Sequence, residues 1–415
     1  MAADSGFADP DDEDLHPAWD DTPDETDADL GARRPRLGQA RSPGRADATE
    51  DLPRLLDPLC AATDALARLD ARAAAAAGPV REGLLARLAW LEAAGCLAHA
   101  HAWAHPLDLA LRERGLAAST ALAAVGAPQQ TLPQTFAAAG NPSAWADPPL
   151  DELAAGDAAI AEALALARAL RRLLAQSGAT AVGTATALAT TLQRLGASMA
   201  DPAGFATWWN GVVSPVRRRP RFGAPDRQGA APALPPLLAA AHTAQSWMAA
   251  GLTHAPTPAQ ALLLAAALLA RAGATRAVAL PVWAAYPALG FGDRDALPSL
   301  RSDAANRLIG WGQPVSWELA FLQLVADSAR MGLRELDRLE ATAETGRGLA
   351  AQADKRSRLP DVIDALLRAP VLTPNALARK LRIAPQTATA LLRDLQAREM
   401  VREVTGRGRF RAFAV

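Results

Sequence analysis

Leucine and alanine recur at helical spacing over most of the chain after residue 51. The first run begins near Leu52 and ends at Gly78-Pro79, a pair that stops a helix. Half of the residues are hydrophobic, but only 5% are aromatic, and valine, isoleucine and threonine seldom occur in runs. Because sheets draw on β-branched and aromatic side chains, this composition predicts a mainly α-helical fold. With 415 residues, the chain is long enough for two or three domains.

Apolar periodicity of the same kind predicts a series of further helices. They are expected at about residues 81–104, 150–176, 183–196, 237–250, 258–270, 296–311 and 315–350. A short helix with Trp208-Trp209 should precede a Pro- and Arg-rich surface loop at residues 211–236. The longest smooth apolar run, Ala261 to Ala270, is too short to cross a bilayer. It predicts a buried core helix, and we expect no membrane partner.

The two ends of the chain carry opposite charge. Residues 1–30 hold twelve acidic side chains and no Lys or Arg, and residues 1–50 have too few large apolar groups to fold, which predicts a disordered acidic tail. From Lys355 to Val415, thirteen Lys or Arg stand against five Asp or Glu, so the net charge there is +8. This asymmetry predicts a polyanionic partner for the C-terminal part.

The cysteine content and the N-terminus bear on location. Cys60 and Cys96 are a poor disulfide framework in a chain of this size, and the N-terminal residues are acidic and polar, unlike a signal peptide. Both features predict a cytoplasmic protein.

The last sixty residues divide into three expected helices and a hairpin. The first helix ends at Pro370, the second begins with Thr373 as N-cap before Pro374, and the third opens at Pro385. The segments "MVREV" and "RFRAFAV" then alternate apolar and polar residues around the turn "TGRG", as half-buried strands do. This order predicts a winged helix-turn-helix over residues 355–415.

In such a domain the third helix enters the major groove of DNA. Side chains of Gln386, Thr387, Thr389 and Arg393 are expected on its outer face, where Gln and Arg can pair with the edges of adenine and guanine. Phosphate contacts are expected from Arg379, Lys380 and Arg382, and from Arg407, Arg409 and Arg411 on the hairpin. The alternative is a winged helix that serves only for packing or for contacts with a protein.

Several segments resemble a known group of proteins. They read "ELDRLEAT", "SRLPDVIDALLRAPVLTPNALARKL", "APQTATALL" and "REVTGRGRFRAF", with weaker likeness in "GPVREGLLARLAWLEAAGCL" and "LPPLLAAAHTAQSW". They resemble an alphaproteobacterial, often plasmid-borne family in which a domain of unknown function precedes a helix-turn-helix DNA-binding domain. This resemblance implies a DNA-binding protein.

The layout is also similar to a distant Fic-type helical domain with a C-terminal winged helix. Fic enzymes carry a loop that reads roughly HPFxDGNGR, in which the histidine is the base and the glycine-rich backbone binds phosphate. Here His254 precedes Ala255-Pro256 and none of the rest of the loop follows. The resemblance therefore implies a degenerate Fic-like domain to which no catalytic residue can be transferred.

Two other clusters carry side chains of interest. The first cluster contains Cys96, His99, His101 and His105, which lie close together in the sequence. On a helix, His101 and His105 would share one face. The two hypotheses are a metal site, for which no zinc spacing is met, and a helix with half-buried imidazoles. Trp208-Trp209 before the arginines of residues 217–221 is either a nucleic-acid surface or two core tryptophans beside a solvated loop, and we favour the second.

Together these patterns predict a double-stranded DNA-binding protein that acts as a transcriptional regulator. The helical domain, residues 51–352, would supply dimerisation or the sensing of an unknown small-molecule effector. We expect no enzyme activity, no cofactor and no metal. The alternatives are a Fic-like nucleotidyl (AMP) transferase with a divergent active-site loop, and a protein-interaction scaffold.

Overall fold

A computed structural model describes most of the segments in which helices are expected. The described residues are 52–99, 104–116, 157–175, 184–199, 201–213, 234–285, 306–307, 314–315, 317–354, 357–405 and 411–415. The expected acidic tail, most of the Pro- and Arg-rich loop, and the tip of the C-terminal hairpin lie outside them. The residues from Leu52 to Val415 form one compact unit.

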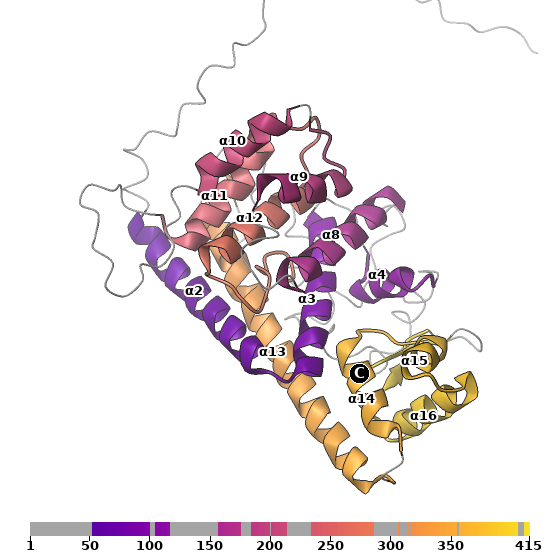
Figure 1. Ribbon diagram of the computed structural model, residues 1–415. Coiled ribbons are helices and arrows are strands. Elements are labelled where there is room, and N and C mark those ends of the chain that lie inside the picture. The colour runs from indigo at the N-terminus through magenta and orange to yellow at the C-terminus, as the bar shows by residue number, and fades with distance from the viewer. Residues whose placement is uncertain are drawn as a thin grey trace, which may run out of the picture. The chain divides into compact units, whose positions relative to one another are not determined.

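Helices dominate this unit, which agrees with the alanine- and leucine-rich composition (Figure 1). Before the C-terminal segment they are α2 (Leu52–Ala75), α3 (Gly78–His99), α4 (Pro106–Glu113), α8 (Asp157–Ala175), α9 (Ala185–Arg194), α10 (Pro202–Val213), α11 (Pro236–Ala249), α12 (Pro258–Ala272) and α13 (Trp317–Gln352). The breaks between them follow local signals. Thr257, for example, opens α12 with a capping box to Gln260, and Gly273 ends it in the left-handed conformation.

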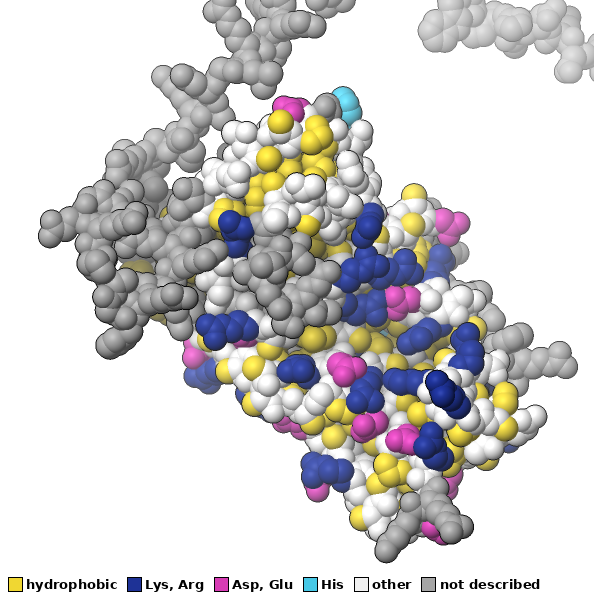
Figure 2. Space-filling view, viewed as in Figure 1, with side chains coloured by type: hydrophobic (Ala, Val, Ile, Leu, Met, Phe, Trp, Pro, Cys, Tyr) yellow, Lys and Arg dark blue, Asp and Glu magenta, His cyan; other side chains and the backbone are white. Residues whose placement is uncertain are grey.

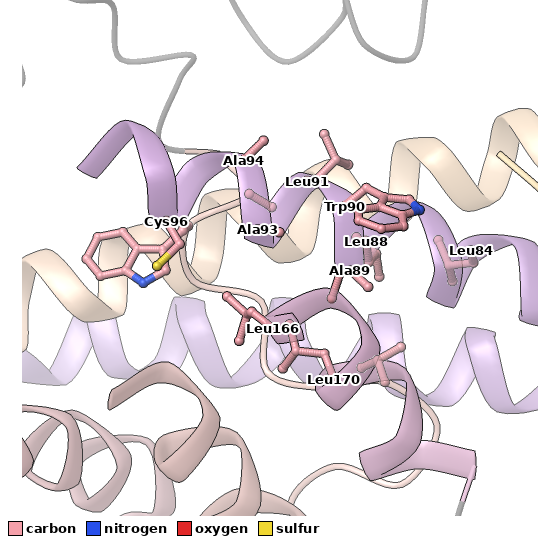
Figure 3. Packing of buried hydrophobic residues seen from close by; sticks show 14 of the residues in the cluster. Leu84, Leu88, Ala89, Trp90, Leu91, Ala93, Ala94, Cys96, Leu166 and Leu170 are labelled. Atoms are coloured by element: carbon pink, nitrogen blue, oxygen red, sulfur yellow. The ribbon is translucent and has the colours of Figure 1, made fainter. Parts of the chain in front are cut away.

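Long helices that are far apart in the sequence pack side by side. The 36-residue helix α13 runs along α2, and α8 crosses α3. Figure 3 shows Leu88 and Ala89 of α3 on the side that faces Leu166 and Leu170 of α8. These side chains are buried in a continuous hydrophobic core. The predicted core helix α12 is buried over most of its length, as its apolar run requires.

Two carboxylates hold the irregular segment that follows α12. Asp70 accepts hydrogen bonds from the amides of Arg276, Ala277 and Val278. The buried Glu92 accepts from the amides of Val282, Trp283 and Ala284, each at 2.9 Å. Burial raises the pKa of Glu92 to about 7, against the opposing effect of these three amides.

The prediction of one helix is wrong at the positions that the structure describes. The helix expected over residues 296–311 is replaced at Asn306–Arg307 by strand β1, which pairs antiparallel with β2 (Pro314–Val315). Apolar periodicity was weak in this stretch. Pro314 also removes a backbone donor just before α13, which disfavours a helix that runs straight through.

The C-terminal segment contains α14 (Leu359–Arg368), α15 (Pro374–Leu381), α16 (Pro385–Ala397) and the strands β3 (Arg402–Glu403) and β4 (Phe413–Ala414). The two strands pair antiparallel, and Phe413 also bridges to Leu372 before α15. The amide of Val404 also donates to the carbonyl oxygen of Ala412 at 2.9 Å, so the pairing continues beyond the two named strands. A mainly α-helical chain with a C-terminal helix-turn-helix and a small hairpin is the fold class that the sequence predicts, and the structure confirms it.

The first helix of this segment is packed into the helical part of the chain. Helix α14 contacts α3 and α13. A Cβ on Gly83 would lie 1.9 Å from the carbonyl oxygen of Leu367, so only glycine allows this approach of α3 to the end of α14. The guanidinium of the buried Arg87 donates to the same oxygen at 2.9 Å and to that of Ala369 at 3.4 Å.

Candidate nucleic-acid interface

Helices α15 and α16 are set by short-range signals in the sequence. The Thr373 hydroxyl accepts from the amide of Ala376 at 3.1 Å, and Pro374 occupies the first turn of α15. Arg382 ends α15 in the left-handed conformation with φ of 54°. The extended Ala384 then precedes Pro385, which opens α16. The result is the short turn between two helices that defines a helix-turn-helix.

Helix α16 has one buried face and one exposed face. Ala388, Leu392 and Leu395 are fully buried against the rest of the segment. Gln386, Thr387, Ala390 and Arg393 are exposed. Their spacing follows the helical period, so these four side chains form one continuous stripe on the solvent side. We call this set the α16 stripe.

Thr389 lies off the stripe. Its side chain is half-buried, and its hydroxyl donates to the carbonyl oxygen of Pro385 at 2.9 Å, within the same helix. Threonine often makes this internal bond in a helix. Thr389 is therefore less available for contacts with a partner than Thr387.

Four basic residues of α15, its C-cap and α16 are exposed to solvent. They are Arg379, Lys380, Arg382 and Arg393. None of the four forms an ion pair with any residue that the structure describes. Burial and the nearby charge of Arg368 lower the pKa of Lys380, against the opposing effect of the carboxylates of Glu82 and Asp364.

The hairpin is only partly described. Arg407 and Arg409 lie outside the described residues. Arg411 is half-buried, and its Nε lies 3.6 Å from a carboxylate oxygen of Glu403 on the paired strand. This pairing ties Arg411 to the hairpin itself.

The histidine hypothesis assumed one helix through His105, and that assumption is wrong. Helix α3 ends at His99, and His105 is the extended N-cap of α4, whose Nδ1 accepts from the amide of Leu107 at 3.1 Å. His101 lies outside the described residues. Burial lowers the pKa of His105 to about 3. No group of three or more potential metal ligands occurs among the side chains that are described.

The tryptophan pair belongs to the core, as we favoured. Trp209 is 1% exposed. The half-buried Trp208 packs against Phe205 and Trp247 in tilted arrangements, with ring centroids 5.9 and 5.5 Å away. The arginines of residues 217–221 lie outside the described residues.

Sequence reasoning missed the residues that connect the helix-turn-helix to the rest of the chain. Arg87 is 1% exposed, and its Nε lies 3.2 Å from the equally buried Glu335 of α13. Burial lowers the pKa of Arg87 to about 10, so it remains charged at neutral pH. A charged residue within the apolar run "LLARLAWL" was the available signal, because buried charges are normally paired.

Comparison with known proteins agrees with this geometry. Residues 359–415 match a family described as a helix-turn-helix DNA binding domain. The chain therefore carries such a domain at its C-terminal end, built from α14 to β4. The chain thus falls in the class of proteins that carry a DNA-binding helix-turn-helix.

One relative adds a weaker match. The uncharacterized protein y4cF of Sinorhizobium fredii (strain NBRC 101917 / NGR234) is 33% identical over 98 residues, which cover 23% of this chain and 24% of that protein. The chain thus matches about a quarter of the length of this relative. These matches do not show the Fic-like part of the resemblance or the plasmid-type family. Among the described helices, none has both the length and the apolar content of a membrane span.

Proposed function

We propose that this protein binds double-stranded DNA with the α16 stripe in the major groove and acts as a transcriptional regulator. The observation that carries the proposal is the stripe itself, an exposed face of the second helix of a helix-turn-helix. The preceding helix α15 ends in exposed cations that form no ion pair within the described chain. Such exposed charge suits the phosphates of a duplex.

The stripe has the dimensions that a groove contact needs. Gln386 and Arg393 are seven residues apart, which corresponds to about 10 Å along a helix and therefore to the rise of about three base pairs. Gln pairs well with adenine and Arg with guanine, so we assign base contacts to these two. Arg379 and Arg382, on α15 and at the turn, are assigned to phosphates. The β3–β4 hairpin would act as the wing.

The helical part of the chain, residues 51–352, is proposed to be non-catalytic and to serve dimerisation or effector sensing. The packing of α14 on α3 and α13 supports a sensing role. A change in this packing would move the helix-turn-helix as a whole.

The test uses the full chain. Duplexes selected from a random pool would be titrated by fluorescence anisotropy over a series of salt concentrations. We expect affinity to fall with salt with a log–log slope of roughly −5, which corresponds to about six phosphate contacts. The double variant Gln386→Ala/Arg393→Ala should lose most of the preference for the selected sequence, because each such base contact contributes about 1–3 kcal/mol.

The control variant is Arg68→Ala. Arg68 is exposed on α2 and pairs with Asp64 within that helix, so its removal takes away one positive charge far from α16 in the sequence. It should leave both affinity and preference unchanged. If the double variant and the control bind the selected duplex equally well, α16 does not read DNA and the proposal is wrong.

A further inference from the structure

The α16 stripe has a small apolar residue at its centre. Ala390 is exposed, follows Gln386 by four residues and Thr387 by three, and precedes Arg393 by three. Because side chains three and four positions apart are neighbours on a helix, Ala390 lies between the other three members of the stripe. Figure 2 shows apolar side chains beside Lys and Arg over the α14–α16 region of one face.

Two polar side chains close to Ala390 in the sequence are engaged within α16. The hydroxyl of Thr389 donates to the carbonyl oxygen of Pro385 at 2.9 Å. Asp394 accepts a hydrogen bond from Nε of Arg398, one turn further on, at 3.1 Å. Ala390 itself has only a methyl group, so it presents no polar atom to the edge of a base.

The major groove offers few partners for such a methyl group. Ring nitrogens, carbonyl oxygens and amino groups of the bases all form hydrogen bonds there, whereas the 5-methyl group of thymine is apolar. A methyl group placed against a polar base edge would displace water without replacing its hydrogen bond, which costs free energy. Against the thymine methyl group, the same contact buries two apolar surfaces. Thymine is therefore the base that best fits Ala390.

The helical spacing indicates which base pair this would be. Gln386 and Arg393 are about 10 Å apart along the helix, which corresponds to the rise of about three base pairs. Ala390 lies near the middle of this distance. With the outer base pairs assigned to Gln386 and Arg393, the base pair between them falls to Ala390.

We propose that Ala390 is a specificity-determining residue that reads the 5-methyl group of a thymine in this middle base pair. The inference rests on the proposed function and deepens it, because it names a base that the α16 stripe selects. The contact involves no hydrogen bond. Its contribution should therefore disappear when the methyl group is removed from the base or when the alanine is made polar.

The experiment uses the full chain and a duplex selected from the random pool. Each thymine of the site is replaced in turn by uracil, which pairs with adenine in the same way and lacks only the 5-methyl group. The variants Gln386→Ala and Arg393→Ala locate the outer base pairs as the positions where each variant loses base preference, and so identify the middle pair. Fluorescence anisotropy gives the dissociation constant for every duplex.

Two serine variants provide the matched comparison. Ala390→Ser makes the centre of the stripe polar with little change in volume. Ala67→Ser is the control, because Ala67 is also exposed within a helix but belongs to α2, far from α16 in the sequence. Thermal unfolding would verify that both variants are folded.

We expect uracil in the middle base pair to weaken binding of the parent chain roughly fourfold, the effect of one buried methyl-sized group. Ala67→Ser should keep this ratio, and Ala390→Ser should bind the thymine and uracil duplexes equally. A middle base pair without thymine, no effect of uracil there, or a ratio that Ala390→Ser leaves unchanged overturns this inference while the proposed function stands. If the parent chain binds no duplex, both are overturned.

Discussion

Two arginines that join helices of the helical part differ from three arginines on α15, at its C-cap and on α16. In the helical part, Arg87 is buried against Glu335, and Arg72 joins α2 to Asp337 and Glu340 of α13. In the helix-turn-helix, Arg379, Arg382 and Arg393 are exposed without an ion pair to any described residue. The first two are therefore engaged within the fold, whereas the other three are exposed to solvent.

Exposure and ion pairing distinguish arginines that stabilise the fold from candidates for partner binding more clearly than composition does. Removal of one partner from a charge pair that is buried in the fold is strongly destabilising, because it leaves the other charge buried without compensation. A charge that is left exposed contributes little to stability, but it can release counterions when it meets a phosphate. We therefore expect substitutions of the paired arginines to lower stability more than DNA binding, and substitutions of the exposed arginines to weaken DNA binding more than stability.

The largest loss of stability is expected for Arg87→Met. Methionine fills a similar volume but leaves the carbonyl oxygens of Leu367 and Ala369 without their donor, and leaves the buried Glu335 with Arg338 alone. Removal of one partner from a buried ion pair costs about 3–5 kcal/mol. Urea unfolding followed by circular dichroism would measure it.

Arg72→Met is the matched control for that measurement. Arg72 also pairs with two carboxylates of α13, but its side chain is 41% exposed. Exposed pairs contribute about 0–1 kcal/mol. Equal losses in the two variants would show that burial does not distinguish these arginines.

A smaller loss is expected for Gly83→Ala, at about 1–3 kcal/mol, because the added methyl group overlaps the Leu367 carbonyl and forces α3 and α14 apart. Gly348→Ala in α13 is the control. Its Cβ would meet nothing within 4 Å, so alanine should stabilise that helix by about 0.5–1 kcal/mol. The melting temperatures of the two variants should move in opposite directions. A stable Gly83→Ala would mean that α14 is not fixed against α3.

The sequence predicted the elements of the interface well, because its signals there are local. Thr373-Pro374 and Pro385 mark where α15 and α16 begin, and the helical period places Gln386 and Arg393 outside. It did not predict the contact of Arg87 with Leu367, which joins residues 280 positions apart. It also did not predict the hydrogen bond from Thr389 to Pro385 or the ion pair of Arg411 with Glu403.

The next effect depends on pH and concerns His105. Burial holds its pKa at about 3, below the ordinary 6.5, so the unfolded chain binds a proton that the fold excludes. The stability that depends on neutral His105 is therefore present above pH 6.5 and is lost as the pH falls toward 3. At pH 5 the loss is about 2 kcal/mol.

The titration of Glu92 changes the stability of the fold in the opposite direction. Its pKa is raised from 4.5 to about 7, so the fold holds a proton that the unfolded chain lacks between these values, and stability increases as the pH falls through that window. The effects of His105 and Glu92 on stability oppose each other in the parent chain.

The variant His105→Asn separates them, because it keeps an N-cap acceptor and removes the titration of His105. Its unfolding free energy, relative to that of the parent, should rise by about 2 kcal/mol from pH 7 to pH 5; parallel curves would contradict this.

The smallest expected effect on stability is in the α16 stripe, and it completes the comparison. Arg393 is exposed and makes no ion pair with a described residue, so Arg393→Met removes no interaction that holds the fold together. Exposed substitutions of this kind change the unfolding free energy by less than about 0.5 kcal/mol. The same variant should lose at least tenfold in affinity for a selected duplex, since it gives up a base contact and a positive charge. Arg87→Met should show the reverse pattern under conditions where it remains folded, with a large loss of stability and a smaller change in affinity. If Arg393→Met instead destabilises the chain as Arg87→Met does, the α16 stripe is part of the core packing and its charge is not reserved for a partner.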